Sequence, residues 1–155
     1  MKLHLIRHAK ATSQVGTNDI SRKLSTKGIL QAKGLSEYLN GKIDGCLIWC
    51  SDAARTRQTL NIIEKEFSIE KIKYKIDFYL CPKEIMLQQI WNSSLNKDLV
   101  IIGHNYGISD LLNYFTGEMI SMQTGEYICI DFGELTLAES SKNTGVICDQ
   151  FRFTS

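Results

Sequence analysis

The sequence of 155 residues predicts an α/β fold. Short apolar, β-branched runs alternate with stretches of helical periodicity, which is the pattern of a sheet whose strands are joined by helices. The length fits one domain spanning residues 1–155 and is sufficient to bury a substantial core. Apolar residues make up 43% and charged residues 23%, which argues against a disordered or membrane-spanning chain.

The first half of the chain is predicted to place two helices among three strands. The strands are short apolar runs, and the helices carry apolar residues spaced by three and four. The third strand alternates apolar residues with lysines, which predicts a half-exposed strand near a sheet edge. In order, the elements are a strand at 3–6, a loop at 13–19, a helix at about 27–39 capped by Ser25 or Thr26, a strand at 46–50, a helix including 56–67 and the lysine-rich strand at 71–76.

The second half is predicted to begin with a helix and a fully buried strand. The run LVIIG at 99–103 has the continuous apolar character of a strand covered on both faces. The helix after it, which includes 108–115, has the clearest amphipathic pattern of the chain. The remaining elements are a helix at 84–95 and three strands at 127–132, 135–138 and 146–151, which are expected to pair antiparallel.

The net charge of +1 hides an uneven distribution. Residues 1–78 contain 14 Lys and Arg against 8 Asp and Glu, whereas residues 79–155 contain 4 against 9. The overall balance argues against a polyanionic partner, so the positive half is either solvated surface or converges in part on a smaller anion. Four of the five arginines lie in this half: Arg7, Arg22, Arg55 and Arg57.

Histidines and arginines directly follow three of the predicted strands. Arg7 and His8 follow the first strand, Arg55 lies in the first turn of the helix after the second, and His104 follows the strand at 99–103. Because ligands in open α/β sheets bind beyond the carboxyl ends of the strands, we expect these four side chains to share one pocket. Helix N-termini beside it would also favour an anion.

Two histidines and two arginines in one pocket suit phosphoryl transfer. Arginine binds phosphate oxygens bidentately and stays charged at every working pH. A neutral imidazole can attack phosphorus and form a phosphohistidine that water later hydrolyses. Preorganised cations stabilise the charge on the transferring phosphoryl group. The positions of Arg22 and Arg57 leave open whether they belong to the pocket rim or to the surface.

Five segments in order resemble the histidine phosphatase superfamily of phosphoglycerate-mutase-like proteins, and most closely its short bacterial branch, the phosphohistidine phosphatases. The resemblance implies a nucleophilic His8, with Arg7, Arg55 and His104 completing the phosphate pocket. It also implies a three-layer α/β/α sandwich around a mostly parallel mixed sheet, and neither a metal nor an organic cofactor. The segments are LIRHAKA (5–11), RKLSTKGILQA (22–32), SDAARTRQT (51–59), IIGHN (101–105) and MQTGEYICIDF (122–132).

The sequence departs from the superfamily pattern at two points. Ala9 stands where the first motif usually has glycine, a form that the short branch often shows. Larger relatives supply a glutamate as general acid, and here the stretch 77–85 offers only Asp77 or Glu84, of which Glu84 is the candidate. A marginal general acid favours a phosphoramidate or aryl phosphate substrate, because imidazole leaves more readily than an alkoxide.

We therefore expect a phosphatase that passes through a phosphohistidine on His8 and acts on phosphohistidine in a protein. The alternatives are a small-molecule phosphomonoesterase or mutase of the same superfamily and a non-catalytic module that binds phosphorylated proteins. Mutase activity is less expected because no segment is long enough to form a lid that excludes water.

Several other classes are disfavoured by the composition. Five cysteines without C-x-x-C pairs indicate reduced thiols in a cytoplasmic protein. Cys50 precedes the arginines, but neither the four residues before Arg55 nor the six before Arg57 match the loop of a cysteine phosphatase. Three histidines and no acidic cluster argue against a metallohydrolase. No signal peptide, membrane span or aromatic-interleaved basic stripe is present, so neither a membrane nor nucleic acid is an expected partner.

Overall fold

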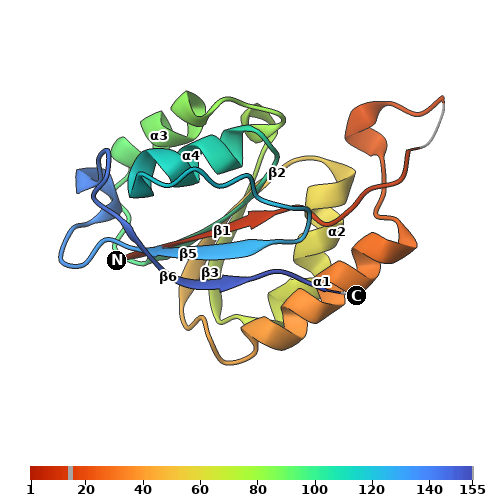
Figure 1. Cartoon of the computed structure of the whole chain (residues 1–155), viewed down its shortest axis with the longest axis horizontal. Coiled ribbons are helices and arrows are strands. Elements are labelled where there is room, and N and C mark those ends of the chain that lie inside the picture. Colours follow the sequence, from red (N-terminus) through yellow and green to blue (C-terminus); the bar gives the residue numbers. More distant parts are fainter. Residues whose placement is uncertain (14–15, 155) are drawn as a thin grey trace.

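The structure, a computed structural model, describes residues 1–13 and 16–154 and places a mixed sheet between two layers of helices (Figure 1). In the strand order β3-β2-β4-β1-β5-β6 the first four strands are parallel, whereas β5 is antiparallel to β1 and β6 to β5. The predicted α/β fold with a mostly parallel mixed sheet is confirmed. The strands are β1 (Lys2–Arg7), β2 (Cys46–Ser51), β3 (Ile69–Lys75), β4 (Asp98–Gly103), β5 (Tyr127–Asp131) and β6 (Val146–Phe151), and the helices are α1 (Thr26–Leu39), α2 (Ala54–Ile63), α3 (Lys83–Trp91) and α4 (Gly107–Thr116).

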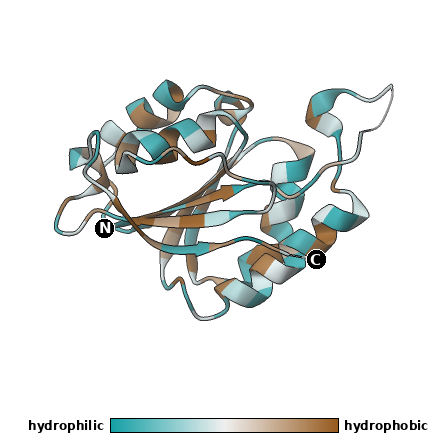
Figure 2. Cartoon of the chain, in the orientation of Figure 1, coloured by the Kyte–Doolittle hydropathy of each residue, from teal (hydrophilic) through white to brown (hydrophobic). Residues whose placement is uncertain are grey.

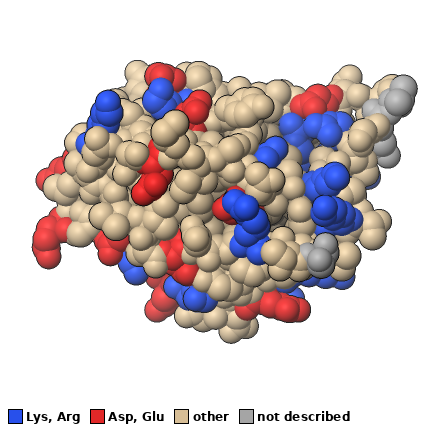
Figure 3. All heavy atoms as spheres, in the orientation of Figure 1, with Lys and Arg blue, Asp and Glu red and all other residues tan. Residues whose placement is uncertain are grey.

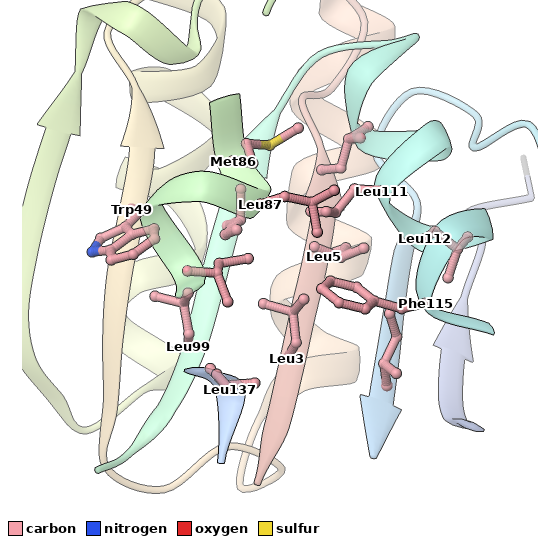
Figure 4. Close-up of a cluster of buried hydrophobic side chains, with 14 of the residues drawn as sticks. Leu3, Leu5, Trp49, Met86, Leu87, Leu99, Leu111, Leu112, Phe115 and Leu137 are labelled. Atoms are coloured by element: carbon pink, nitrogen blue, oxygen red, sulfur yellow. The ribbon is translucent and has the colours of Figure 1, made fainter. Parts of the chain in front are cut away.

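One face of the sheet is covered by α3 and α4. Their apolar side chains point toward the sheet and meet buried leucines of β1 and β4 (Figure 4). Each large apolar side chain that is fully buried in this way stabilises the fold by about 1.5–3 kcal/mol. The cluster includes Leu3, Leu5, Met86, Leu87, Leu99, Leu111, Leu112 and Phe115.

The opposite face is covered by α1 and α2. Successive residues of a strand point to opposite faces, so Ile101 joins the cluster under α4 whereas Val100 and Ile102 join the one under α1 and α2. Figure 2 shows hydrophobic residues along the strands, and hydrophobic and hydrophilic residues mixed along the helices. Burial on both faces explains why β4 has no polar alternation.

The register of the parallel strands brings their carboxyl ends to one edge. Arg7 pairs with Gly103 across β1 and β4, and Cys50 pairs with Ile102 across β2 and β4. The residues that follow these three strands therefore emerge side by side. This edge is where the sequence predicts the pocket.

Most predicted elements are present, with local differences. The lysine-rich strand β3 pairs only with β2 and is an edge strand, as predicted. The predicted strand at 135–138 is wrong: this segment contains a 3₁₀ helix at Leu137–Glu139, whose Leu137 is buried while Thr136 and Glu139 form a capping box. The predicted helix at 84–95 ends at Trp91.

Two further expectations can be compared with the described residues. Ser25 caps α1, because its Oγ accepts a hydrogen bond of 3.1 Å from the amide of Gly28. Residues 14–15 of the predicted loop at 13–19 lie outside the part of the chain that the structure describes. Within that part, none of the helices is both long enough and apolar enough to span a bilayer.

Candidate active site

The carboxyl ends of β1, β2 and β4 open into a hollow of about 330 Å³ that contains all four predicted pocket residues. Arg7 and His8 come from the end of β1, Arg55 from the first turn of α2, and His104 from the residue after β4. The other lining residues are Lys10, Ala11, Asp19, Arg22, Leu80, Asn105 and Thr124. Four cationic side chains and one carboxylate therefore surround the two imidazoles.

His8 is buried and held in one orientation. Its amide donates a hydrogen bond to the carbonyl of Gly103 at 3.1 Å, and its Nδ1 lies 2.7 Å from the carbonyl oxygen of Ala9. Because a carbonyl only accepts, Nδ1 must carry the proton and Nε2 keeps a lone pair. Burial, together with the nearby His104 and Arg55, lowers the pKa of His8 to about 3 although the Ala9 hydrogen bond opposes this. The imidazole is therefore neutral at pH 7.

Arg55 is 2% exposed and lies against the unprotonated nitrogen of His8. Its Nε–H donates to His8 Nε2 at 3.3 Å. The two Nη groups donate to Asp19, one to its backbone oxygen at 2.8 Å and one to its carboxylate at 3.0 Å. The same carboxylate accepts hydrogen bonds from Tyr79 and Arg22, and these bonds, that of Tyr79 above all, lower the pKa of Asp19 well below its ordinary value. Asp19 is therefore a permanent anion that fixes Arg55.

His104 lies beside His8, with 5.2 Å between the ring centroids. Its Nε2 is 2.7 Å from the hydroxyl of the fully buried Ser51. Burial and the charge of Arg55 lower the pKa of His104 to about 4, so this imidazole is also neutral at pH 7. Its Nδ1 is buried without a hydrogen-bond partner in the described part of the chain.

Arg7 supplies a second unsatisfied donor to the pocket. One Nη group donates to the carbonyl of Met122 at 2.8 Å, whereas the buried Nε has no partner among residues 1–13 and 16–154. Buried polar groups are rarely left unpaired in folded proteins. Arg7 and His104 both line the hollow, so an anion bound there is a candidate partner for these two groups.

Glu84 does not fit the general-acid role predicted from the sequence. The structure places it in the first turn of α3, with its side chain 66% exposed and paired with Lys83 at 2.8 Å. It lines a different hollow of about 560 Å³, together with Leu87, Trp91 and Tyr114. Of the stretch 77–85, which corresponds to the segment that supplies the acid in larger relatives, Leu80 lines the pocket and Glu84 does not.

The structure also decides the residues that the sequence left open. Arg22 lines the pocket and binds Asp19 and the carbonyl of Thr12, each at 2.9 Å. Arg57 instead pairs with Asp52 and lies 3.6 Å over the ring of Tyr74, away from the pocket. Burial raises the pKa of Cys50 to about 12, which keeps it a thiol and disfavours a cysteine nucleophile.

Sequence reasoning missed three residues that shape the site. Asp19 lies in a polar loop without any periodic pattern, so nothing marked it as the partner of Arg55. Tyr79 approaches from the 3₁₀ turn Ile76–Phe78 only because of the tertiary fold. Ser51 ends β2, and the reasoning used for the other strand ends could have found it.

Comparison with known proteins gives independent support for this site. The family model described as histidine phosphatase superfamily (branch 1) matches residues 3–77, which include Arg7, His8 and Arg55. The comparison with curated proteins gives no significant match.

Several solved structures share the fold over nearly the whole chain. A provisionally assigned phosphohistidine phosphatase SixA from Nakamurella multipartitia is 21% identical, with a TM-score of 0.81, over 99% of this chain and 96% of its own. A provisionally assigned SixA from Agrobacterium tumefaciens is 23% identical, with a TM-score of 0.77, over 97% of each chain. A protein histidine phosphatase SixA complexed with tungstate is 18% identical, with a TM-score of 0.78, over 97% of this chain and 96% of its own.

The family match and the site agree on the class of protein. The matched segment contains the pair that follows β1 and the arginine that begins α2, and the fold brings the histidine after β4 to the same place. Residues 3–77 match the model of the histidine phosphatase superfamily (branch 1), the whole chain has the fold of the SixA structures, and together they support a phosphatase of the histidine type.

Proposed function

We propose that this protein removes the phosphoryl group from phosphohistidine in a protein substrate, through a phosphohistidine intermediate on His8. The observation that carries the proposal is a neutral His8 whose unprotonated Nε2 accepts a hydrogen bond from Nε–H of the buried Arg55 at 3.3 Å. A nucleophile is thus held beside a cation that can stabilise the phosphoryl oxygens. The SixA structures, two of them provisionally assigned, carry the same fold.

The reaction needs two displacements at phosphorus. His8 Nε2 donates its lone pair to phosphorus, and the bond from phosphorus to the leaving group breaks with its electron pair going to that group. Water then attacks the phosphorus of phospho-His8, the P–Nε2 bond breaks, and inorganic phosphate and neutral His8 are regenerated. Arg7, Arg55 and His104 Nδ1 donate hydrogen bonds to the phosphoryl oxygens throughout, because charge on these oxygens is what catalysis must stabilise.

The absence of a suitable acid favours phosphohistidine as substrate. Asp19 is the carboxylate among the described pocket residues, and its hydrogen bonds to Tyr79 and Arg55 keep it ionised. An alkoxide leaving group would need a proton from the protein. A phosphohistidine ring that is protonated on its other nitrogen departs as neutral imidazole and needs none. The pocket therefore suits a substrate that brings its own proton.

Phosphoenzyme trapping tests the mechanism. The protein is incubated with a phosphohistidine-containing protein labelled with ³²P, and acid-labile, base-stable label on the enzyme is measured after rapid quenching. We expect label on the wild type and none on His8→Ala, whereas His4→Asn, which changes a buried histidine outside the pocket, keeps the label. Wild-type protein that binds the substrate without being labelled would favour a non-catalytic binding module.

The substrate class is tested by comparing turnover. We expect kcat/KM to be higher for a phosphohistidine peptide than for 3-phosphoglycerate or a sugar phosphate. Faster hydrolysis of the sugar phosphate would overturn the preference for phosphohistidine and favour a small-molecule phosphomonoesterase. Appearance of an isomerised phosphoglycerate would instead indicate mutase activity.

A further inference from the structure

A second hollow of about 460 Å³ adjoins the phosphoryl pocket. Arg7, Lys10 and Thr124 line both hollows, so the two are continuous. The second hollow also contains Lys27 near the start of α1 and Arg152 just after β6. The remaining lining residues are Gln31, Gln123 and Phe153. We call Lys10, Lys27 and Arg152 the basic annex.

The basic annex holds more positive charge than one phosphoryl group requires. A phosphoryl group carries a charge of about −1.5 to −2 at pH 7. Arg7, Arg22 and Arg55, less the negative charge of Asp19, already match this charge within the phosphoryl pocket. The annex adds three cations, and none of its described lining residues is acidic. In a chain of net charge +1 this local surplus calls for a second anion.

Two of the three cations have no anionic partner within the described chain. The ion pairs formed among residues 1–13 and 16–154 involve neither Lys10 nor Lys27. Arg152 contacts the buried carboxylate of Glu126 at 3.2 Å but keeps 55% of its side chain exposed. The charges of Lys10 and Lys27 therefore remain available to a bound molecule, and Arg152 keeps an exposed part of its side chain beside them.

A hydrogen-bonded frame holds the backbone around the annex. The side chain of Gln31, which is buried on α1, accepts a hydrogen bond from the amide of Lys10 at 2.9 Å and donates one to the hydroxyl of Thr124 at 3.1 Å. The carbonyl of Lys10 accepts hydrogen bonds from the amide and hydroxyl of Ser25. This frame fixes the annex relative to His8, which is only two residues before Lys10. A fixed spacing favours a ligand whose two anionic groups belong to one molecule.

The annex opens on the surface rather than into the core. Figure 3 shows Lys and Arg side chains gathered on the right-hand part of this face, where Figure 1 places α1 and the carboxyl terminus. Lys10, Lys27 and Arg152 are all exposed. Phe153 packs against α1, since a methyl group on Gly34 would lie 2.6 Å from its ring, and this contact holds the terminal segment in place. An open and extended cationic surface suits a polypeptide that enters the pocket from outside.

We propose that the basic annex binds acidic side chains that flank the phosphorylated residue of a protein substrate. The proposal rests on the proposed function, because it requires the phosphoryl group to occupy the pocket of His8. Carboxylates beside the phosphohistidine would pair with Lys10, Lys27 and Arg152, and so orient the phosphoryl group toward Nε2 of His8. The annex thereby selects acidic over neutral surroundings.

The test compares two phosphohistidine peptides of equal length. One has glutamates and the other glutamines on both sides of the phosphohistidine, and the ratio of their kcat/KM values is the readout. Lys27→Gln is the main variant because Lys27 forms none of the described ion pairs, and Arg152→Gln is the second. Lys33→Gln, an exposed lysine of the same helix outside both hollows, is the matched control. Turnover of p-nitrophenyl phosphate reports the phosphoryl pocket alone.

We expect the wild type to prefer the acidic peptide and to lose this preference as salt is raised. Lys27→Gln and Arg152→Gln each lower the ratio by about 1.4- to 5-fold, which corresponds to one exposed ion pair. The Lys33→Gln ratio and p-nitrophenyl phosphate turnover by Lys27→Gln match those of the wild type.

Each contrary result has its own meaning. Equal turnover of the two peptides by an active wild type overturns the annex and leaves the proposed function intact. No turnover of any probe, with no phosphoenzyme, overturns the proposed function itself. Faster turnover of 3-phosphoglycerate than of the acidic peptide would assign the annex to a small acid and refute the protein substrate.

Discussion

Ser51→Ala is expected to slow phosphoenzyme formation although Ser51 does not line the pocket. For His104 to donate a hydrogen bond to a phosphoryl oxygen, its Nδ1 must carry the proton. Nε2 must then accept, and the hydroxyl of Ser51 at 2.7 Å is its donor. A serine hydroxyl can also accept, so the bound anion selects the tautomer that carries the proton on Nδ1, and Ser51 stabilises that tautomer by donating to Nε2.

The size of the effect follows from the burial of both partners. Ser51 is fully buried and His104 is 4% exposed, so water cannot easily replace the lost hydroxyl. An orphaned buried acceptor lowers the free energy of unfolding by about 1–3 kcal/mol. A hydrogen bond of about 1 kcal/mol that favours one tautomer corresponds to a change of roughly fivefold in its population. We expect phosphoenzyme formation to slow by about fivefold, less than the 10²- to 10³-fold expected when a donor to the phosphoryl group is removed.

Three measurements separate an effect of Ser51→Ala on the His104 tautomer from an effect on the stability of the fold. Rapid-quench labelling gives the rate of phosphoenzyme formation, urea unfolding gives stability, and ¹⁵N NMR of His104 gives its tautomer. Ser36→Ala is the matched control, because Ser36 is also buried but donates to Glu66 at 2.8 Å, away from the pocket. It should lower stability without changing the rate. A Ser51→Ala protein with an unchanged rate and an unchanged His104 spectrum would refute the role of Ser51.

Four further predictions test the pocket and its frame. Neither His8 nor His104 should titrate between pH 5.5 and 8 by NMR, because their pKa values are lowered to about 3 and 4; a midpoint near 6.5 for either would contradict this. Since the unfolded chain takes up these protons near pH 6.5, the free energy of unfolding should fall as pH falls below that value, and a flat profile from pH 6.5 to 4.5 would count against buried neutral imidazoles. Arg55→Lys keeps the charge but loses the Nε contact to His8 and the paired bonds to Asp19, so phosphoenzyme formation should fall by about 10²-fold or more; a rate near that of the wild type would mean that charge alone suffices. Gly28→Ala would place a methyl group 2.0 Å from the carbonyl oxygen of Lys10 and should lower the urea midpoint by an amount equivalent to about 1–3 kcal/mol, more than Gly34→Ala, whose methyl group meets only a side chain.

The sequence predicts the edge of the sheet where the site lies, because that edge follows from local patterns. Arg7, His8 and His104 are adjacent to strands whose apolar runs are unambiguous, and parallel pairing then brings them together. The error at 135–138 has the opposite origin. Leu135 and Leu137 alternate as in a strand, but Leu137 packs into the core from a 3₁₀ turn. Tertiary packing therefore overrides the local strand pattern here.

The partners of the pocket residues could not be predicted in the same way. Asp19 meets Arg55 across 36 positions and Ser51 meets His104 across 53, and neither spacing corresponds to a periodic element. Glu84 failed for a related reason, since a first-turn glutamate is equally compatible with a pocket and with solvent. Local sequence patterns predict which side chains lie at the ends of the strands. The hydrogen-bond partners of these side chains depend on tertiary contacts with loops, which local patterns do not predict.

Asp19 links the electrostatics of the pocket to its chemistry. Arg55 is 2% exposed, and a buried guanidinium without a counterion would carry a large desolvation cost. The carboxylate of Asp19 offsets this cost before substrate arrives and holds the guanidinium in the orientation that directs Nε to His8. The negative charge of this carboxylate also repels an incoming phosphoryl dianion. This repulsion weakens the binding of the substrate before it reacts. Holding Arg55 in advance favours the transition state over tight binding of phosphate, which suits an enzyme that must release phosphate after every turnover.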